Sequence, residues 1–224
     1  MTNHSPSYQS EPTRRIMCIS DLHERWNTDR LRYSREMYGD ILLVAGDLTF
    51  QGSFTKYGEF NDWVAKLNFK HKIVIPGNHD VTFESDFEQS EANMPEVLVL
   101  DQTIAEAEGL TIYGEPRQPE FYDWAYNVPR DRMGRDVWRH APENIDILLT
   151  HGPPLGAGDL TDRGEHVGCE FQRKYILEHK PKLVVCGHIH SGYGIHLLGD
   201  TVVVNASICN EKYRALNAPI YINM

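Results

Sequence analysis

Five short polar motifs follow one another along this chain, and each contains residue types that bind metals or transfer protons. In order, they are Asp21-x-His23, Gly46-Asp47, Gly77-Asn78-His79-Asp80, Thr150-His151-Gly152 and Gly187-His188-x-His190. Carboxylate, amide and imidazole groups suit borderline to hard divalent ions such as manganese, iron, zinc or cobalt. Together the motifs supply enough ligands for two metal ions. An aspartate can bridge two cations, and Asp47 is the candidate for that bridge.

Each motif follows a short apolar run that predicts a buried β-strand. These runs cover residues 16–20, 41–45, 72–76, 145–149 and 182–186. The carboxyl ends of strands in an open α/β sheet form the natural ligand crevice, so segments that are distant in sequence converge there. The sequence therefore predicts a single site built from five strand exits.

Other elements are predicted between and after the motifs. Apolar residues at three- and four-residue spacings favour helices over residues 28–37, 53–69, 86–93 and 168–179, with Ser53 as a candidate N-cap. Residues 97–100 and 110–114 are expected to pair as strands across an acidic turn. Residues 194–198 and 201–205 are expected to form a hairpin about Gly199-Asp200. The pattern by itself predicts the α/β class.

Length and motif spacing favour one domain. With 224 residues, of which 41% are hydrophobic, the chain can bury one substantial core. The motifs span Asp21 to His190 with no Ser/Gly/Pro-rich linker between them, so a division would cut the site apart. We expect a single domain over residues 14–224. Residues 1–13 are polar, contain two prolines and lack periodicity, which predicts a flexible N-terminal tail.

Composition bears on location and partners. No early apolar run resembles a secretory signal, and no stretch approaches the roughly 20 apolar residues that cross a bilayer, so we expect a cytoplasmic protein without membrane contact. The four cysteines form no C-x-x-C pair, which favours reduced thiols in the core. A formal charge of −10 disfavours long nucleic acid as a partner but is compatible with a small nucleotide. The oligomeric state stays open.

The ordered motifs resemble the signature of the calcineurin-like metallophosphoesterase superfamily, which is D-x-H, G-D, G-N-H-D/E, a lone H and G-H-x-H. Residues 150–156, 187–194 and 205–207, together with the segment 116–129, are similar to its metallophosphoesterase-domain-containing (MPPED-type) branch. This likeness runs from about Ile16 to the C-terminus. It implies a four-layer αββα sandwich of two mixed β-sheets flanked by helices.

The resemblance also implies a role for each motif residue. It makes His79 the catalytic histidine. One metal ion is implied to bind Asp21, His23, Asp47 and His190. The other is implied to bind Asp47, Asn78, His151 and His188. Manganese or iron is the expected ion at both positions, with zinc, cobalt or nickel as alternatives.

These residues suggest a hydrolytic mechanism. Two metal ions roughly 3.5–4 Å apart lower the pKa of a shared water from about 15.7 toward 7, which yields a bridging hydroxide that attacks phosphorus. His79 is expected to protonate the leaving oxygen or to bond to the phosphate, because imidazole exchanges protons near neutral pH. Asp80 is the second catalytic candidate, since a carboxylate that accepts the other ring N–H would orient His79.

Two interpretations of residues 116–132 are open. This aromatic and basic segment forms either a lid that stacks on a nucleobase or ordinary packing over the sheet. Within it, Arg117 either clamps a phosphate or lies at the surface. His196 follows the last motif, and plain packing in a hairpin strand is favoured for it over substrate contact.

The leading hypothesis is a dinuclear metal-dependent phosphodiesterase that acts on small nucleotide-like phosphodiesters. A phosphomonoesterase with the same site is the close alternative, because the same two cations can bind a monoester and the motifs do not determine the shape of the pocket. A nuclease would require an open groove, and the negative charge disfavours it. A non-catalytic protein-interaction scaffold is the alternative from a different class, and the intact motifs argue against it.

Overall fold

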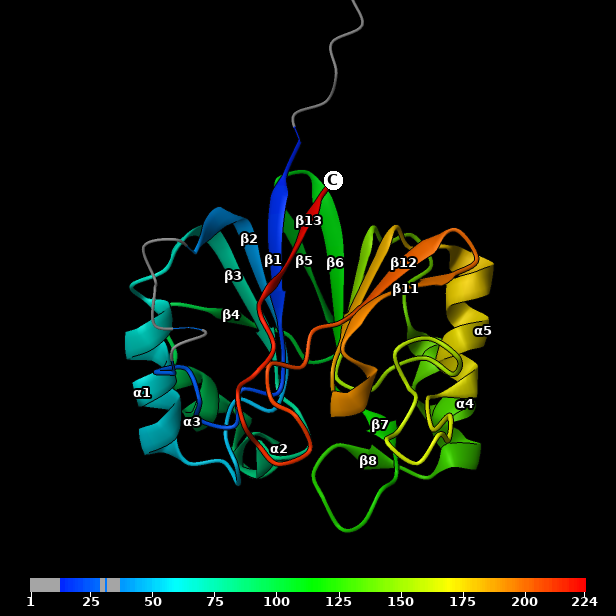
Figure 1. Ribbon diagram of the computed structural model, residues 1–224, viewed down its shortest axis with the longest axis horizontal. Helices are drawn as coiled ribbons and strands as arrows, with labels where there is room; N and C mark the ends of the chain where they lie inside the picture. Colours follow the sequence, from blue (N-terminus) through cyan, green and yellow to red (C-terminus); the bar gives the residue numbers. More distant parts are fainter. Residues whose placement is uncertain (1–12, 29–30, 32–36) are drawn as a thin grey trace, which may run out of the picture.

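Two mixed β-sheets lie face to face at the centre of the molecule (Figure 1). The computed structural model describes residues 13–28, 31 and 37–224. The first sheet has the strand order β13-β1-β2-β3-β4, in which β13 runs antiparallel to β1 and the other pairs are parallel. Its strands are β1 (Arg15–Ile19), β2 (Tyr38–Ala45), β3 (Asn68–Ile75), β4 (Leu98–Val99) and β13 (Ile220–Asn223).

The second sheet has the order β11-β12-β10-β9-β6-β5. Its four central strands are parallel, and each edge strand pairs antiparallel with its neighbour. The strands are β5 (Thr103–Ala107), β6 (Leu110–Glu115), β9 (Ile147–Thr150), β10 (Leu183–Cys186), β11 (Gly194–Leu198) and β12 (Thr201–Asn205). Both sheets are therefore mixed.

Helices cover the outer face of each sheet, as Figure 1 shows. Against the first sheet lie α1 (Phe54–Val64), α2 (Val81–Ser85) and α3 (Phe87–Ala92). Against the second lie α4 (Met133–Asp136) and α5 (Glu170–His179). Short elements join these layers: the pair β7 (Gln118–Pro119) and β8 (Asn127–Val128), and the 3-10 helices η2 (Arg130–Arg132), η3 (Trp138–His140) and η4 (His190–Gly192). The predicted four-layer arrangement is confirmed.

The alternating pleat of the strands divides the hydrophobic residues between separate cores. In β2, Leu43 packs between the sheets, whereas its neighbours Leu42 and Val44 pack against the helices. From the second sheet, Leu149 and Val185 join the core between the sheets. A strand that is covered on both faces needs apolar residues at every position, which explains the continuous apolar runs in the sequence.

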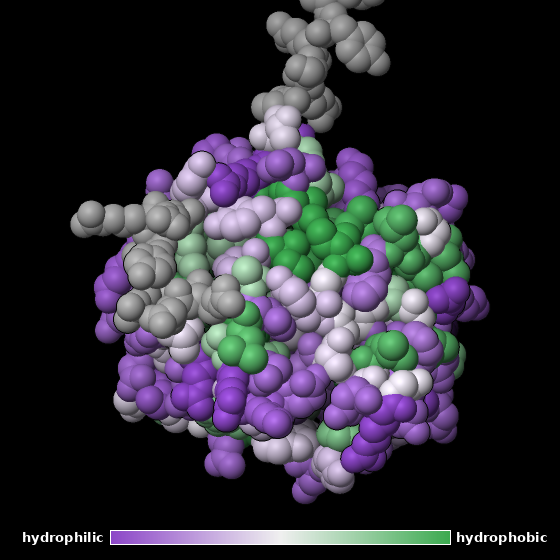
Figure 2. Space-filling model, in the orientation of Figure 1, coloured by the Kyte–Doolittle hydropathy of each residue, from purple (hydrophilic) through white to green (hydrophobic). Residues whose placement is uncertain are grey.

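The core between the sheets reaches the surface at one margin. Figure 2 shows hydrophobic side chains gathered over β13 and the β11–β12 hairpin. On the edge strand β11, Ile195 is 58% exposed and Leu197 is 72% exposed. Ile222 and Met224 pack against the inter-sheet core and are only partly buried. The two sheets thus remain open to solvent along this side.

Several predicted elements have shifted bounds. The helix expected over residues 53–69 ends at Val64, with Ser53 as its N-cap, because Asn68 already pairs with Tyr38 as the first residue of β3. The helices expected over residues 86–93 and 168–179 correspond to α3 and α5, and the hairpin about Gly199 is confirmed. The helix expected over residues 28–37, like residues 1–12 of the expected tail, lies largely outside the described residues.

The expected pairing of residues 97–100 with 110–114 is wrong. β4 joins β3 in the first sheet, whereas β6 pairs with β5 across a two-residue turn. Glu108 and Gly109 both adopt positive φ angles, of 53° and 76°, as a tight type I′ hairpin requires. The Glu-Gly pair was the signal for this turn. Among the described residues, no helix is long and apolar enough to span a membrane.

The inter-sheet core generates a stability prediction. Leu43→Ala is expected to lower the free energy of unfolding by about 2–5 kcal/mol, because it leaves a cavity between two sheets that cannot close on it. The matched control is Leu197→Ala, which removes the same atoms from an exposed side chain and should change stability by less than about 0.5 kcal/mol. Urea unfolding of the metal-free proteins measures both, and equal losses would contradict this assignment of the core.

Candidate metal centre

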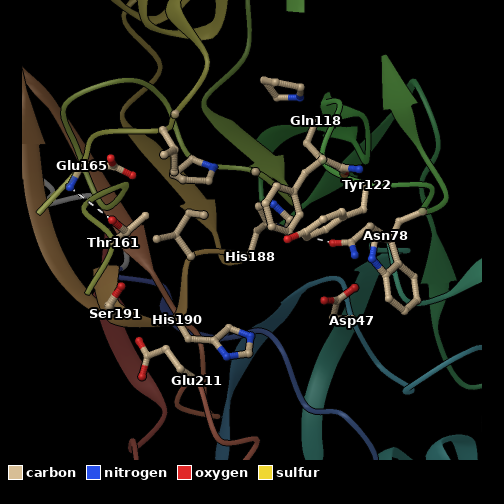
Figure 3. A pocket seen from close by; sticks show the side chains of 18 of the residues that line it. Asp47, Asn78, Gln118, Tyr122, Thr161, Glu165, His188, His190, Ser191 and Glu211 are labelled. Carbon is tan, nitrogen blue, oxygen red and sulfur yellow. Dashed lines mark hydrogen bonds between the residues drawn. The ribbon is translucent and has the colours of Figure 1, made fainter. Parts of the chain in front are cut away.

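The ends of five parallel strands bring the motif side chains to one place. Figure 3 shows side chains from different strand exits, including Asp47 and His190, facing the same cavity. From the first sheet, β1, β2 and β3 lead to Asp21, His23, Asp47 and Asn78. From the second sheet, β9 and β10 lead to His151, His188 and His190. The structure therefore brings together all seven residues predicted as metal ligands.

One group of ligand atoms surrounds His190. Its Nε2 atom lies 3.1 Å from Asp21 Oδ1 and 3.4 Å from His23 Nε2. His23 Nε2 in turn lies 3.6 Å from Asp47 Oδ2. The ligand atoms of Asp21, His23 and His190 all lie within 4.8 Å of one another, as a common cation would require. These are the residues predicted for the first metal ion.

A second group surrounds Asn78. Its Oδ1 atom lies 2.9 Å from His151 Nε2 and 2.8 Å from His188 Nδ1. His151 Nε2 also lies 3.3 Å from Asp47 Oδ1. Asp47 thus presents Oδ1 to this group and Oδ2 to the first group. One carboxylate oxygen for each group is the arrangement that a bridging ligand needs, so these donors fit two cations of borderline character.

Hydrogen bonds to atoms outside the two groups fix the orientation of several predicted ligands. His151 Nδ1 donates to the carbonyl oxygen of Ala45 over 2.8 Å, and His190 Nδ1 donates to that of Asn210 over 2.9 Å. Each bond leaves Nε2 to face the cluster, as in known metal sites. Asp21 accepts from the Ser207 hydroxyl, 2.8 Å away, and from the His188 backbone N–H. The sequence offered no chemical reason to single out Ser207 for this contact.

The backbone is strained where these ligands lie. Positive φ angles are uncommon outside glycine, yet they occur at 53° in Asp21, 42° in His23, 51° in Asp47 and 65° in His188. Each left-handed residue turns the chain sharply at its strand exit. Gly77 allows a close approach of two loops, because a Cβ atom there would lie 2.3 Å from the Asp47 backbone nitrogen. The turns bring carboxylate and imidazole groups nearer than regular loops would.

Buried charges balance one another across the two groups. Burial lowers the pKa of His151 and His190, but attraction to Asp47 and Asp21 respectively outweighs it and raises both pKa values to about 9. Burial and repulsion from His151 lower the pKa of His188 to about 3. Burial raises the pKa of the two aspartates, but the neighbouring histidines hold it far below the usual range. In the metal-free protein, protons on His151 and His190 therefore supply the compensating positive charge.

His79 lies beside the ligand groups and is held by two hydrogen bonds. Its backbone N–H donates to Asp47 Oδ1 over 2.9 Å, and its ring Nδ1 donates to the carbonyl oxygen of Phe50 over 2.7 Å. The indole of Trp124 covers its ring at a centroid distance of 4.2 Å. His79 lines the cavity, and Nε2 is the ring nitrogen left for a substrate.

The expectation that Asp80 orients His79 is wrong. The fully buried Asp80 carboxylate accepts from the backbone N–H groups of Leu48, Thr49 and Gly77 over 2.9–3.0 Å and from the Thr49 hydroxyl. The backbone carbonyl oxygen of Phe50, rather than Asp80, accepts the hydrogen bond from the His79 ring. Burial, followed by repulsion from Asp47, raises the pKa of Asp80 to about 6. Asp80 therefore ties together the loops that carry Asp47 and Asn78.

The cavity beside the metal centre has a volume of about 720 Å³. It is lined in part by residues 118–122, 124, 161–163, 165 and 188–191, together with Tyr213, whose ring meets that of His23 edge-on at 4.7 Å. The segment 116–132 thus forms one wall. Arg117 does not serve as the suggested phosphate clamp, because it pairs with Asp101 at 2.5 Å and with Glu115.

Two further features complete the surroundings of the cavity. Arg130 lines it but is bound to Glu170 and to the carbonyl oxygens of Val167 and Gly168. His196 donates to the Gly192 carbonyl oxygen over 2.8 Å, which agrees with the packing role favoured for it. Tyr213 and Phe50 reach the site from segments without a recognisable motif, whereas Ser207 comes from residues 205–207, which carry part of the family resemblance but had no assigned role.

Comparisons with known proteins agree with this geometry. The family model for calcineurin-like phosphoesterases matches residues 14–192. Metallophosphoesterase domain-containing protein 1 of Homo sapiens is 37% identical to this chain over 235 residues, which cover 94% of this chain and 71% of the human protein. The 3′,5′-cyclic adenosine monophosphate phosphodiesterase CpdA of Vibrio vulnificus is 27% identical, covering 79% of this chain and 64% of its own length.

Solved structures support the same fold. The protein TT1561 of Thermus thermophilus is similar to this structure with a TM-score of 0.62 at 18% sequence identity, over 87% of this chain and 89% of that protein. This likeness concerns the fold alone. The family match covers most of the chain, including all five motifs and both sheets up to η4. The chain belongs to the calcineurin-like phosphoesterase family.

Proposed function

We propose that this protein is a dinuclear metal-dependent phosphodiesterase that hydrolyses small nucleotide-like phosphodiesters. The observation that carries the proposal is the Asp47 carboxylate, which presents one oxygen to each of two ligand groups. The family supports a metal-dependent phosphoester hydrolase in general. The relative named as a cyclic adenosine monophosphate phosphodiesterase favours a diester as substrate. The cavity of about 720 Å³ has room for a nucleotide-sized molecule.

The proposed ligands are those predicted from the motifs. Asp21, His23 and His190 would hold one ion, Asn78, His151 and His188 the other, and Asp47 both. Manganese or iron is the proposed ion, and zinc, cobalt and nickel are compatible with the same donors. When bound, the cations supply positive charge to the phosphoryl oxygens and lower the pKa of water.

His79 is the proposed general acid. The oxygen of a water molecule forms the new bond to phosphorus, the ester P–O bond breaks, and the leaving oxygen takes a proton from His79 Nε2. The water releases its proton to solvent, from which His79 is reprotonated. Phe50 supports this role, since its carbonyl oxygen accepts from Nδ1 in the protonated ring as well as the neutral one. Asp80 contributes indirectly by fixing the loop that carries His79.

The first test compares two model substrates. Metal-stripped protein reconstituted with manganese is expected to hydrolyse bis(p-nitrophenyl) phosphate faster than p-nitrophenyl phosphate. For a diester with an alcohol leaving group, His79→Ala should lower kcat about 10²–10⁴-fold, because it removes the proton donor, while manganese stays bound; for bis(p-nitrophenyl) phosphate, whose leaving group needs little protonation, the loss should be much smaller. Asp47→Ala should abolish turnover and manganese binding together, because both ligand groups lose an oxygen. The matched control is Asp200→Ala, which removes a side chain that is 89% exposed and should behave as wild type.

The outcomes separate the alternatives. A preference for the monoester would favour a phosphomonoesterase, and turnover of single-stranded oligonucleotides above that of small diesters would favour a nuclease. Absence of turnover with manganese, iron or zinc would favour an interaction scaffold. Metal content is measured alongside activity in each variant.

Metal binding is expected to release protons. His151 and His190 have pKa values of about 9 and are therefore protonated at pH 7.5, yet each must be neutral to bind a cation. Manganese binding at pH 7.5 should displace about two protons, and affinity should rise as the pH increases toward 9. Calorimetry in buffers of different ionisation enthalpy measures this number. His151→Gln should reduce the number of protons released on manganese binding by about one. A release of no protons by the wild type would contradict the proposed charge state.

A further inference from the structure

Trp124 covers one face of the His79 imidazole. The two ring centroids lie 4.2 Å apart, and the ring planes are tilted by 33°. His23 meets the same imidazole edge-on at 4.8 Å. Tyr213 meets it edge-on as well, at a centroid distance of 6.1 Å, and the ring Nδ1 donates a 2.7 Å hydrogen bond to the Phe50 carbonyl oxygen. His79 and Trp124 both line the cavity.

The backbone around Trp124 is tied directly to the metal-site loop. The N–H of Ala125 donates to the carbonyl oxygen of Asn78, the residue before His79. The Ala125 carbonyl oxygen accepts from Gln118 Nε2 over 3.0 Å. The N–H of Tyr126 donates to Glu84 over 2.9 Å. The backbone hydrogen bond between Ala125 and Asn78 therefore fixes the position of Trp124 relative to His79.

The base of the segment is anchored as well. Glu115 is fully buried at the end of β6, and its carboxylate accepts from the Arg117 backbone and guanidinium. Arg117 also binds Asp101, which follows β4 of the other sheet. At the other end, Asn127 Nδ2 donates to the Tyr122 carbonyl oxygen over 2.9 Å. The segment that carries Trp124 is thus fixed by hydrogen bonds at both ends and forms one wall of the site.

We infer that Trp124 is a positioning residue for His79. Its indole keeps the imidazole in the plane set by the Phe50 carbonyl, shields the Nδ1–H bond from water, and leaves Nε2 aimed at the leaving oxygen. This inference rests on the proposed role of His79 as general acid. Proton transfer depends steeply on such alignment, because a small misplacement of a catalytic group can cost about 10²-fold in rate.

The kinetic test is a double-mutant cycle in the manganese-loaded, full-length protein. Trp124→Ala is expected to lower kcat about 10–100-fold for a diester with an alcohol leaving group, with little change in KM. The loss should be much smaller for bis(p-nitrophenyl) phosphate, whose leaving group needs little protonation. Trp124→Phe should restore most of the activity, because it retains an aromatic face. In a His79→Ala background, Trp124→Ala should have almost no further effect.

The matched control is Phe121→Ala. Phe121 is an exposed aromatic residue of the same segment and lines the same cavity, but its ring meets Tyr122 and His188 rather than His79. Its effect, whatever its size, should multiply with that of His79→Ala. A Trp124→Ala loss that is equally large with and without His79 would overturn the inference, since Trp124 would then act on the substrate or on the fold.

A second measurement needs no turnover. The Nδ1–H proton of His79 should give a downfield proton resonance that is absent in His79→Ala, and its exchange with water should accelerate in Trp124→Ala and slow again in Trp124→Phe. Manganese is omitted from these samples because it broadens the signals. Unchanged exchange in Trp124→Ala would overturn the inference. If the wild type turns over no diester while exchange responds as expected, the proposed function fails and the positioning contact stands.

Discussion

The carboxylate of Asp47 is the element on which the rest of the site depends. It lies between His23 and His151, which come from different sheets, and it also accepts the backbone N–H of His79. The Asp47 backbone has a left-handed conformation at this point, with a φ of 51°. That turn in turn requires the close approach of Gly77. One residue thus connects the end of β2 with the loop after β3 that carries His79.

The energetic problem of such a site is the burial of charge. Asp21 and Asp47 are almost inaccessible to solvent, and an isolated carboxylate in such surroundings would be protonated or would destabilise the fold. Backbone N–H groups, the Ser207 hydroxyl and protonated histidines provide the compensation. Asp80 differs, because it faces N–H donors rather than cations: these donors lower its pKa, but burial and repulsion from Asp47 outweigh them and raise it to about 6. The pKa values of Asp21 and Asp47 are therefore lowered, whereas that of Asp80 is raised.

The positions where the strands end could be predicted from the sequence, because aspartate, asparagine or histidine follows each of the five apolar runs. The layers were predictable only through the family resemblance, since a doubly covered strand shows no alternation. β5 was missed because Ile104 is exposed and its partner is fixed by the Glu108-Gly109 turn rather than by hydrophobicity. The early end of α1 reflects pairing of Asn68 with β2, a tertiary contact that helical spacing does not record.

Within the site, the motifs predicted which residues converge but not what supports them. The partners of His79, His151 and His190 are backbone carbonyl oxygens, which leave no trace in side-chain identity. The expected link from Asp80 to His79 failed because adjacency in sequence does not determine side-chain direction. Trp124 lies in the aromatic segment that the sequence analysis singled out, yet only the structure shows that Trp124 is the aromatic residue of this segment that contacts the His79 imidazole.

The division of the ligands between the two sheets has a mechanical consequence. Each proposed metal ion takes donors from both sheets: His190 joins Asp21 and His23 at one, and His151 and His188 join Asn78 at the other. Along the edge strands β11 and β13, the core between the sheets reaches the solvent. On this proposal the ions act as removable cross-links that close one end of the sandwich. Metal supply would then determine how far the two halves of the chain can separate, in addition to whether the reaction proceeds.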